Sequence, residues 1–200
     1  MLMNTIFLSL FLSFFAGEPT DSPVVQNAGF NEALFDAGTF QDLLGRSGCD
    51  GIRFYNTLKD GRVEVMAVSI SGGADMNGGL FPRKPYVVAK GVKNNEIEVE
   101  HVSEGDARDL CEAMHMSENM QYSADFSKSD FQTLFRDANT NAVRVQPRST
   151  ADGLSMQVEA VNFDRGQVND VGQGEMYEMT STDPCPPICG VRENYVFSPL

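Results

Sequence analysis

The 200-residue sequence contains no tryptophan and only two histidines. The missing tryptophan disfavours an aromatic platform for sugars or stacked bases, although the 14 phenylalanines can fill a hydrophobic core. Basic residues are also scarce, since 15 lysines and arginines stand against 28 acidic residues and the net charge is −13. Because this charge repels phosphate backbones and anionic membranes, we expect no nucleic-acid partner, whereas a basic protein or a divalent cation stays compatible.

Recognisable catalytic motifs are absent as well. The sequence has no G-x-S-x-G, H-E-x-x-H, P-loop or dinucleotide-binding motif. His101 follows Glu100, but neighbouring residues on a strand point to opposite faces, and no nucleophile accompanies them. The sequence therefore predicts no catalytic residue and no cofactor.

Two loops contain oxygen-rich residues of the kind that bind cations. The loop from Asp137 to Asn141 begins like a calcium loop, but Ala142 replaces the turn glycine and Arg148 stands in place of the bidentate glutamate. The loop from Asp164 to Gly172 has the residue types of ordinary turns. We predict no metal site in either loop.

The N-terminal part contains a continuous apolar run, Ile6 to Phe15, followed by Ala16-Gly17. The run is too short to span a bilayer as a helix but has the length of a signal-peptide core. No lysine or arginine precedes it, and phenylalanines stand where the cleavage site prefers a small residue. We expect residues 1–17 to direct export to the periplasm, the cell surface or the medium, with no further transmembrane span. An uncleaved anchor and a buried helix are the alternatives.

One stretch of the sequence, residues 40–70, occurs twice. The spacing between matching motifs grows from 91 to 93 residues across an Asp-Gly pair, as if one residue had been added on each side of that pair. A β-hairpin with an Asp-Gly type I′ turn accepts such a change without losing its register, so we predict an internal duplication. The first-copy motifs are Phe40-Gln41-x-Leu43-Leu44, Ile52-Arg53-Phe54, Asp60-Gly61 and Val65-x-Ala67-Val68, and their counterparts are Phe131-Gln132-x-Leu134-Phe135, Val143-Arg144-Val145, Asp152-Gly153 and Val158-x-Ala160-Val161.

These patterns predict an α+β fold of two tandem helix plus β-hairpin units, in which antiparallel sheet packs against short helices. The length suffices for one domain or for two small units that share a sheet. We divide the chain into a signal-like segment at 1–17, a first unit with an extra hairpin at 18–102, a second unit at 103–170, and an irregular tail rich in proline and cysteine at 171–200.

The first hairpin is predicted in most detail. Pairing about Asp60-Gly61 puts Phe54 opposite Ala67, so alternate residues share one face. Arg53 and Tyr55 then lie on the opposite, non-core face. The core face is predicted to carry Ile52, Phe54, Leu58, Val63, Val65 and Ala67.

Helices are expected before and between the hairpins. Residues 31–44 have apolar residues at helical spacing with a central glycine, which indicates two short helices or one broken helix. Ser103 begins a helix with a capping box, and Ser127 or Ser129 caps the helix of the second copy. Residues 71–79 are expected to form a glycine-rich loop.

The four cysteines, Cys49, Cys111, Cys185 and Cys189, allow three pairings. Export would place them in an oxidising compartment. The Cys185-Pro-Pro-Ile-Cys189 spacing is too long for a redox C-x-x-C motif, and no second pair stands at zinc-finger spacing. We favour a local Cys185–Cys189 disulfide together with a Cys49–Cys111 disulfide. The two crossed pairings and a buried free thiol at Cys111 stay open.

Three motifs resemble a group of uncharacterised bacterial proteins with G-C-x-G-I-R-x-Y and C-P-P-x-C-G signatures. They are Gly48-Cys49-Asp50-Gly51-Ile52-Arg53-Phe54-Tyr55, Asn162-Phe163-Asp164-Arg165-Gly166 and Cys185-Pro-Pro-Ile-Cys189-Gly190. The resemblance covers mainly residues 40–70 and 184–190, and it implies no known activity, catalytic residue or cofactor. After the first hairpin the chain departs from the group, which has an Asp-Gly-Asn turn where Ser69-Ile70-Ser71-Gly72-Gly73 stands here.

Arg53 and Arg144 occupy equivalent places in the two copies, and Tyr55 shares the non-core face with Arg53. An arginine fork on that face can hold a carboxylate or a phosphate of a partner. The alternative is a salt bridge to a neighbouring strand or helix. We take Arg53, Arg144 and Tyr55 as the candidate binding residues.

The sequence suggests three functions. The first is an exported, non-enzymatic binding or envelope-associated module that meets another protein through its non-core sheet face or its acidic tail. The second is an acidic secreted inhibitor or immunity-type protein that captures a basic partner, with binding that weakens steeply as salt rises. The third is an enzyme that uses the duplicated arginines. The ligand and the oligomeric state stay open.

Overall fold

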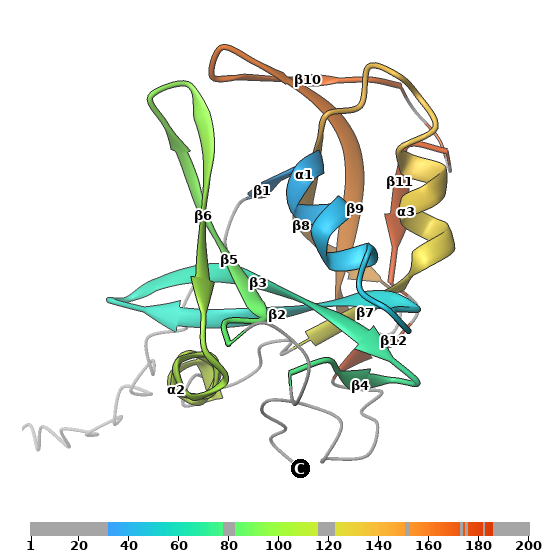
Figure 1. Ribbon diagram of the computed structural model, residues 1–200. Coiled ribbons are helices and arrows are strands. Elements are labelled where there is room, and N and C mark those ends of the chain that lie inside the picture. Colours follow the sequence, from blue (N-terminus) through green and yellow to red (C-terminus); the bar gives the residue numbers. More distant parts are fainter. Residues whose placement is uncertain are drawn as a thin grey trace, which may run out of the picture.

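The computed structural model describes residues 32–77, 83–115, 123–150, 153–172, 174, 176–181 and 183–185. Among the described residues, strands far outnumber helices, and these residues form two antiparallel sheets and three helices (Figure 1). The predicted α+β fold of helix-hairpin units is therefore wrong. Strands dominate because several short segments, which carry little signal of their own, pair with the long hairpins.

Within the described residues, sheet A has five strands and sheet B has seven. In sheet A the order is β1-β8-β9-β10, and β11 pairs with β9; in sheet B the order is β12-β7-β2-β3-β5-β6, and β4 pairs with β3. The strands of sheet A are β1 (Ala33–Asp36), β8 (Ala142–Thr150), β9 (Gly153–Asp164), β10 (Gln167–Asp170) and β11 (Glu178–Thr180). Those of sheet B are β2 (Gly51–Lys59), β3 (Arg62–Ser71), β4 (Ala74–Asp75), β5 (Tyr86–Lys93), β6 (Glu96–Val102), β7 (Ser123–Ser127) and β12 (Asp183–Cys185). The helices are α1 (Ala37–Leu44), α2 (Glu104–His115) and α3 (Lys128–Leu134).

The same order of elements occurs twice along the chain. A short strand, a helix and a hairpin follow one another as β1, α1, β2 and β3, which we call the first repeat, and as β7, α3, β8 and β9, the second repeat. The helices begin at Ala37 and Lys128, which are 91 residues apart. Their N-caps, Asp36 and Ser127, each accept a hydrogen bond from a backbone N–H of the first helical turn.

The two repeats exchange their first strands. β1 pairs with β8 of the second repeat, and β7 pairs with β2 of the first. Phe35 lies opposite Val143 and Phe126 lies opposite Ile52, so each pairing repeats the other with both partners shifted by 91 residues. Each sheet is thus built from both repeats, and the boundaries at 18–102 and 103–170 divide the sequence but not the sheets.

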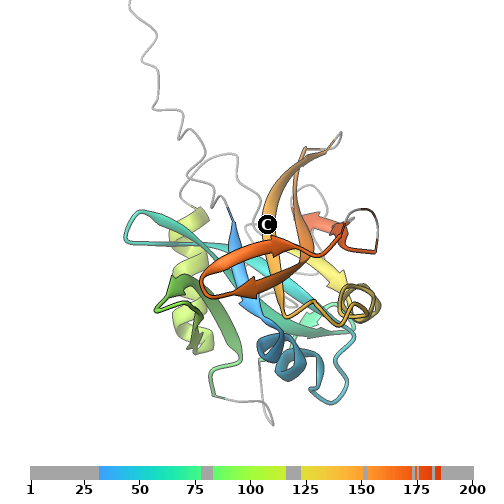
Figure 2. The same cartoon turned by 90° about the horizontal axis from the view of Figure 1, so that it is seen from above.

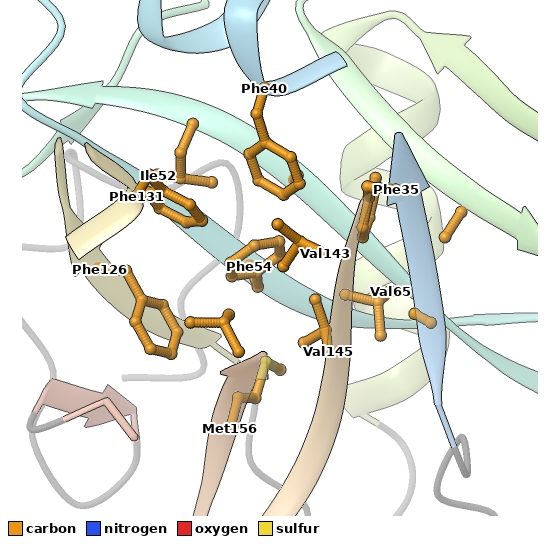
Figure 3. Close-up of a cluster of buried hydrophobic side chains, with 14 of the residues drawn as sticks. Phe35, Phe40, Ile52, Phe54, Val65, Phe126, Phe131, Val143, Val145 and Met156 are labelled. Atoms are coloured by element: carbon orange, nitrogen blue, oxygen red, sulfur yellow. The ribbon is translucent and has the colours of Figure 1, made fainter. Parts of the chain in front are cut away.

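The main core lies between the two sheets and is closed by α1 and α3. Figure 3 shows Phe40 of α1 pointing toward Phe131 of α3 and Phe54 of β2. The rings of Phe40 and Phe131 are stacked with centroids 4.9 Å apart, and both side chains are fully buried. The pairing of Phe54 with Ala67 confirms the predicted register of the first hairpin, and its predicted core residues lie in the core cluster except Leu58.

Helix α2 covers the non-core face of sheet B. Its apolar stripe, including Ala107 and Cys111, packs against Tyr55 of β2 and Met66 of β3, as the helical spacing predicts. The predicted capping box is also present, since the Ser103 hydroxyl accepts from the Asp106 N–H. A residue on the non-core face of β2 is therefore enclosed rather than exposed.

On sheet A, the β5-β6 hairpin covers one end of the non-core face. Ile97 of β6 packs against a small cluster formed by Leu34, Ala142 and Val161. Figures 1 and 2 both show this hairpin on the opposite side of the molecule from α3 and β11. The face near β11 carries the polar residues described below.

Three local predictions differ from the structure. Residues 33–36 form strand β1 rather than helix, because they pair with β8 of the distant second repeat. Part of the predicted glycine loop at 71–79 is strand β4, and part of the predicted irregular tail at 171–200 forms β11 and β12. β1, β11 and β12 are too short to be stable without a partner far along the chain, whereas β4 pairs with the end of β3 directly before it.

The second hairpin turns one residue earlier than predicted. Thr150 pairs with Gly153, so Gly153 belongs to the strand rather than to the turn. The last pair of the first hairpin, Lys59 with Arg62, recurs 91 residues later as this pair, so the residue expected to be added on each side of the second turn is not added. When a turn moves by one residue, each residue of one strand pairs with a residue two positions away from its predicted partner, and every side chain stays on its face. The hydrophobic pattern therefore cannot distinguish the predicted register from the observed one. In the first hairpin Asp60 and Gly61 both have positive φ, as a type I′ turn requires.

Candidate functional site

Arg53 lies buried between sheet B and the elements that cover it. Its Nε and Nη2 donate to the two carboxylate oxygens of Asp125 on β7, each at 2.7 Å. Its Nη1 donates to Asp75 of β4 at 3.0 Å, and Nη2 also donates to the Gly73 carbonyl at 2.9 Å. The Arg53 side chain has no exposed surface, so a partner cannot contact it in this structure.

Asp75 connects this ion pair to two tyrosines. The Tyr55 hydroxyl donates to Asp75 Oδ2 at 2.7 Å, and the Tyr86 hydroxyl donates to the same oxygen at 3.2 Å. Burial and the nearby Asp75 charge raise the pKa of Tyr55 and of Tyr86 above the ordinary value. Burial alone would lower the pKa of Arg53, but Asp125 and the other surrounding groups more than reverse this effect, so the pKa is raised overall and Arg53 stays charged.

Arg144 makes a similar but more open ion pair on sheet A. Its Nε donates to Glu159 of β9 at 2.7 Å, and its Nη2 donates to Asp170 of β10 at 2.7 Å. The side chain of Arg144 is 19% exposed, and that of Asp170 is 68% exposed. Burial lowers the pKa of Arg144, while Glu159 and Asp170 more than reverse this effect.

The aspartates that pair with the two arginines occupy equivalent positions. Asp75 lies opposite Ile70 of β3, and Asp170 lies opposite Val161 of β9. Ile70 and Val161 are 91 residues apart and hold the same place in their hairpins. An arginine and an aspartate on the next strand therefore recur together in both repeats.

The second carboxylate differs between the repeats. Opposite Arg53 on the exchanged strand stands Asp125, whereas Leu34 stands opposite Arg144. The second repeat supplies Glu159 from the neighbouring strand β9 instead. Arg53 is thus enclosed in sheet B, which favours the salt-bridge interpretation for Arg53, and the buried Tyr55 hydroxyl donates to the same Asp75. Arg144 stays closer to the surface.

A pocket of about 780 Å³, which we call the junction pocket, lies where the two sheets meet beside α3. Its walls come from β3, β7, α3, β8, β9 and β11. Apolar atoms of Phe126 and Met179 contribute to the lining, and three carboxylates border it, those of Asp125, Asp130 and Glu178. The pocket therefore combines apolar contact area with negative charge, which suits a ligand that carries both apolar and basic groups.

The guanidinium of Arg148 is the positively charged group of the junction pocket. Arg148 is exposed and lies on β8 opposite Ser155. No acidic residue in the described part of the chain pairs with it. Arg148 can therefore donate hydrogen bonds to a carbonyl or carboxylate of a bound ligand.

A second pocket of about 340 Å³, which we call the arginine pocket, lies beside Arg144. It is lined by Glu159, Asp170, Tyr177 and again Glu178, so Glu178 borders both pockets. Arg144 and Arg148 are four residues apart on β8 and point to the same face. The two pockets therefore lie along one polar face of sheet A.

This polar face carries an excess of negative charge. Two guanidiniums, those of Arg144 and Arg148, accompany the carboxylates of Glu159, Asp170, Asp130 and Glu178. The remaining carboxylate, that of Asp125, is already paired with Arg53. The local excess has the same sign as the net charge of the whole chain, so both attract a basic partner.

Cys49 and Cys111 are free thiols, and both are buried. The Cys49 thiol donates to the Gly51 carbonyl at 3.3 Å, and Cys111 lies on the buried face of α2, where burial raises its pKa. The predicted Cys49–Cys111 disulfide is therefore not formed in this structure. It is absent because Cys49 packs beside β2, whereas Cys111 packs into the cluster of α2 and sheet B. Cys189, the side chain of Cys185 and the signal-like segment 1–17 lie outside the described residues.

The other sequence candidates are not part of the polar face. His101 is exposed on β6, away from both pockets. Within the described ranges, no group of histidine, cysteine and acidic residues is suited to hold a metal ion. None of the helices described there has the length and apolar character needed to cross a membrane.

Comparison of the chain with family models, curated proteins and solved structures gives no match in any of the three.

Sequence reasoning identified Arg144 but not the residues that form the pockets around it. Glu178 lies in a segment predicted to be irregular, and Asp125 lies on a short strand that was not predicted. The signal that was available is the two-residue alternation of Arg144, Gln146 and Arg148 on β8, which places three polar side chains on one face.

Proposed function

We propose that the chain is an exported, non-enzymatic binding module that holds a basic segment of a protein partner on the polar face of sheet A. The junction pocket carries this proposal, because it is a large concave site where apolar surface and unpaired charges occur together. Glu178 and Asp130 receive a lysine or arginine side chain of the partner, and Arg148 holds a carbonyl or carboxylate of the same segment.

The contrast between the two arginines supports this choice of face. Arg53 is enclosed with Asp125 and Asp75 on the face of sheet B that α2 covers, and it contributes to folding. Arg144 lies on the corresponding face of sheet A, which no helix among the described elements covers. The open face is a non-core sheet face of the kind expected for a partner contact. It also contains Arg144, a candidate binding residue from the sequence.

The direct test is peptide binding measured by fluorescence anisotropy. The probe is a labelled peptide of alternating lysine and valine, compared with a peptide of equal length in which glutamate replaces lysine. We expect the lysine peptide to bind and the glutamate peptide not to bind. Glu178→Gln should weaken binding about tenfold, since a hydrogen bond to a charged group contributes about 1.5 kcal/mol or more.

Glu98→Gln is the matched control. Glu98 is a half-exposed glutamate on β6 that pairs with Lys93. β6 is an edge strand of sheet B, and three strands separate it from β7, which lines the junction pocket. Glu98→Gln and Glu178→Gln each remove one negative charge, so a general electrostatic effect would weaken binding equally in both variants. Equal weakening, or equal binding of both peptides, would overturn the proposal.

The net charge of −13 supports a second candidate, an inhibitor or immunity-type protein for a basic partner. The two candidates differ in how much of the binding depends on long-range charge. A fall in affinity of more than about a hundredfold over a tenfold rise in salt, with little effect of Glu178→Gln, would favour the second candidate.

A further inference from the structure

One edge of strand β11 is unpaired in the described structure. β11 pairs with β9 alone. The Ala160 N–H donates to the Tyr177 carbonyl at 2.7 Å, and the Ser181 N–H donates to the Met156 carbonyl at 3.0 Å. These bonds show that the Tyr177 carbonyl and the Ser181 N–H point toward β9.

The positions between them point the other way. In an antiparallel pair, residues alternate between facing the partner strand and facing away from it. The backbone groups of Glu178 and Thr180 therefore point away from β9. The Glu178 N–H closes a turn by donating to the Gly174 carbonyl at 3.2 Å. The Glu178 carbonyl and both backbone groups of Thr180 have no partner in the part of the chain that the structure describes.

This unpaired edge lies in the junction pocket, whose lining includes all of β11 and Ser181. The lining also includes residues of β7 and of the start of α3. The side chains of Glu178 and Thr180 share one face of β11, and Met179 points to the other face. A second strand beside β11 would meet an acidic position and an apolar position in alternation.

We propose that the basic segment binds as an extended strand added to the free edge of β11. This inference rests on the proposed function and names its binding mode. Backbone hydrogen bonds to Glu178 and Thr180 hold the segment, and alternate side chains reach Glu178 on one face and Met179 with Phe126 on the other. The occupant is an extended peptide in which basic and apolar residues alternate.

Charge decides between this occupant and a second copy of the chain. Pairing of β11 with the β11 of another copy would bring Glu178 near its own counterpart, and like charges on neighbouring strands repel. A basic segment places opposite charges there instead. The strand-addition site therefore selects a basic partner over self-association.

The first test uses peptides methylated on their backbone nitrogens. In a strand added to one edge, only every second N–H of the peptide faces β11, and the others face solvent. Two lysine-valine peptides are compared, each methylated on one of the two alternating sets of amides. We expect one set to lose binding about tenfold or more and the other to keep it.

The second test uses the full chain. Thr180→Pro removes a backbone donor that points away from β9, so the pairing of β11 with β9 is retained. Thr180→Val removes the hydroxyl and keeps the donor, and it is the matched control. We expect Thr180→Pro to weaken binding of the lysine-valine peptide about tenfold and Thr180→Val to leave it unchanged.

The peptide experiments distinguish a failure of the proposed function from a failure of the strand-addition mode. If the lysine peptide does not bind, or binds without dependence on Glu178, the proposed function fails and the binding mode fails with it. If it binds through Glu178 but both methylated sets bind equally, strand addition is overturned and the function stands. The methylated peptides decide the question even if Thr180→Pro fails to fold.

Discussion

Arg53 of β2 and Asp125 of β7 are joined by two hydrogen bonds of 2.7 Å each, and they belong to different repeats. The Arg53 side chain is completely buried and that of Asp125 is 21% exposed, so this contact ties β7 of the second repeat to β2 of the first at the border of the junction pocket. The equivalent Arg144 has leucine in place of the aspartate and keeps part of its surface exposed. An arginine at the same position of the hairpin is therefore fully buried in the first repeat and partly exposed in the second.

Removing the two arginines should have unequal effects on stability. Arg53→Ala leaves Asp75 and Asp125 without their buried cation, so we expect it to lower the free energy of unfolding by about 3–5 kcal/mol. Arg144→Ala should cost about 1 kcal/mol, since Glu159 and Asp170 are closer to solvent. Urea denaturation followed by circular dichroism measures both values. Equal costs would contradict the structural difference between the two sites.

The exchange of β1 and β7 predicts that neither half of the chain folds alone. When residues 18–118 and 119–200 are produced as separate chains, each lacks the strand that pairs with its long hairpin. We expect little β-structure by circular dichroism in either half and recovery of the signal when the halves are mixed. Two independently folded halves would show that each repeat can use its own first strand.

The buried tyrosines predict a loss of stability at alkaline pH. The pKa of Tyr55 is raised by burial and by Asp75 above its ordinary value of 10.0. The neutral hydroxyl therefore stabilises the fold fully below pH 10, and this contribution is lost as the pH rises further. We expect the free energy of unfolding to fall by about 1.4 kcal/mol per pH unit for each buried tyrosine. Tyr55→Phe should reduce the slope between pH 10 and 12, and an unchanged slope would argue against the assignment.

Burial of Cys49 and Cys111 predicts that both thiols are protected in the folded protein. The two residues are 8% and 2% exposed, and burial keeps Cys111 protonated by raising its pKa. Iodoacetamide should label both slowly under native conditions and rapidly in urea, as measured by mass spectrometry of peptides. Detection of a Cys49–Cys111 disulfide in the unreduced protein would instead support the pairing predicted from sequence.

The sequence by itself determined the features that depend on neighbouring residues. The register of the first hairpin follows from the alternation of its apolar residues and the Asp60-Gly61 turn. The N-cap at Ser103 follows from a side chain that reaches a backbone group within one turn, and the N-cap of α3 was narrowed by the same reasoning to Ser127 or Ser129, of which the structure has Ser127. In all of these, the interacting groups are close along the chain, so their spacing is visible in the sequence.

Only the tertiary structure decided which faces are buried and where a pocket forms. Arg53 and Asp125 are 72 residues apart, and nothing local to either residue indicates that they meet. Strand β11 has three residues and is a strand only because β9 lies beside it. Strand pairing and burial depend on contacts between distant segments, and the polar face of sheet A exists because those contacts cover the other faces and leave this one open.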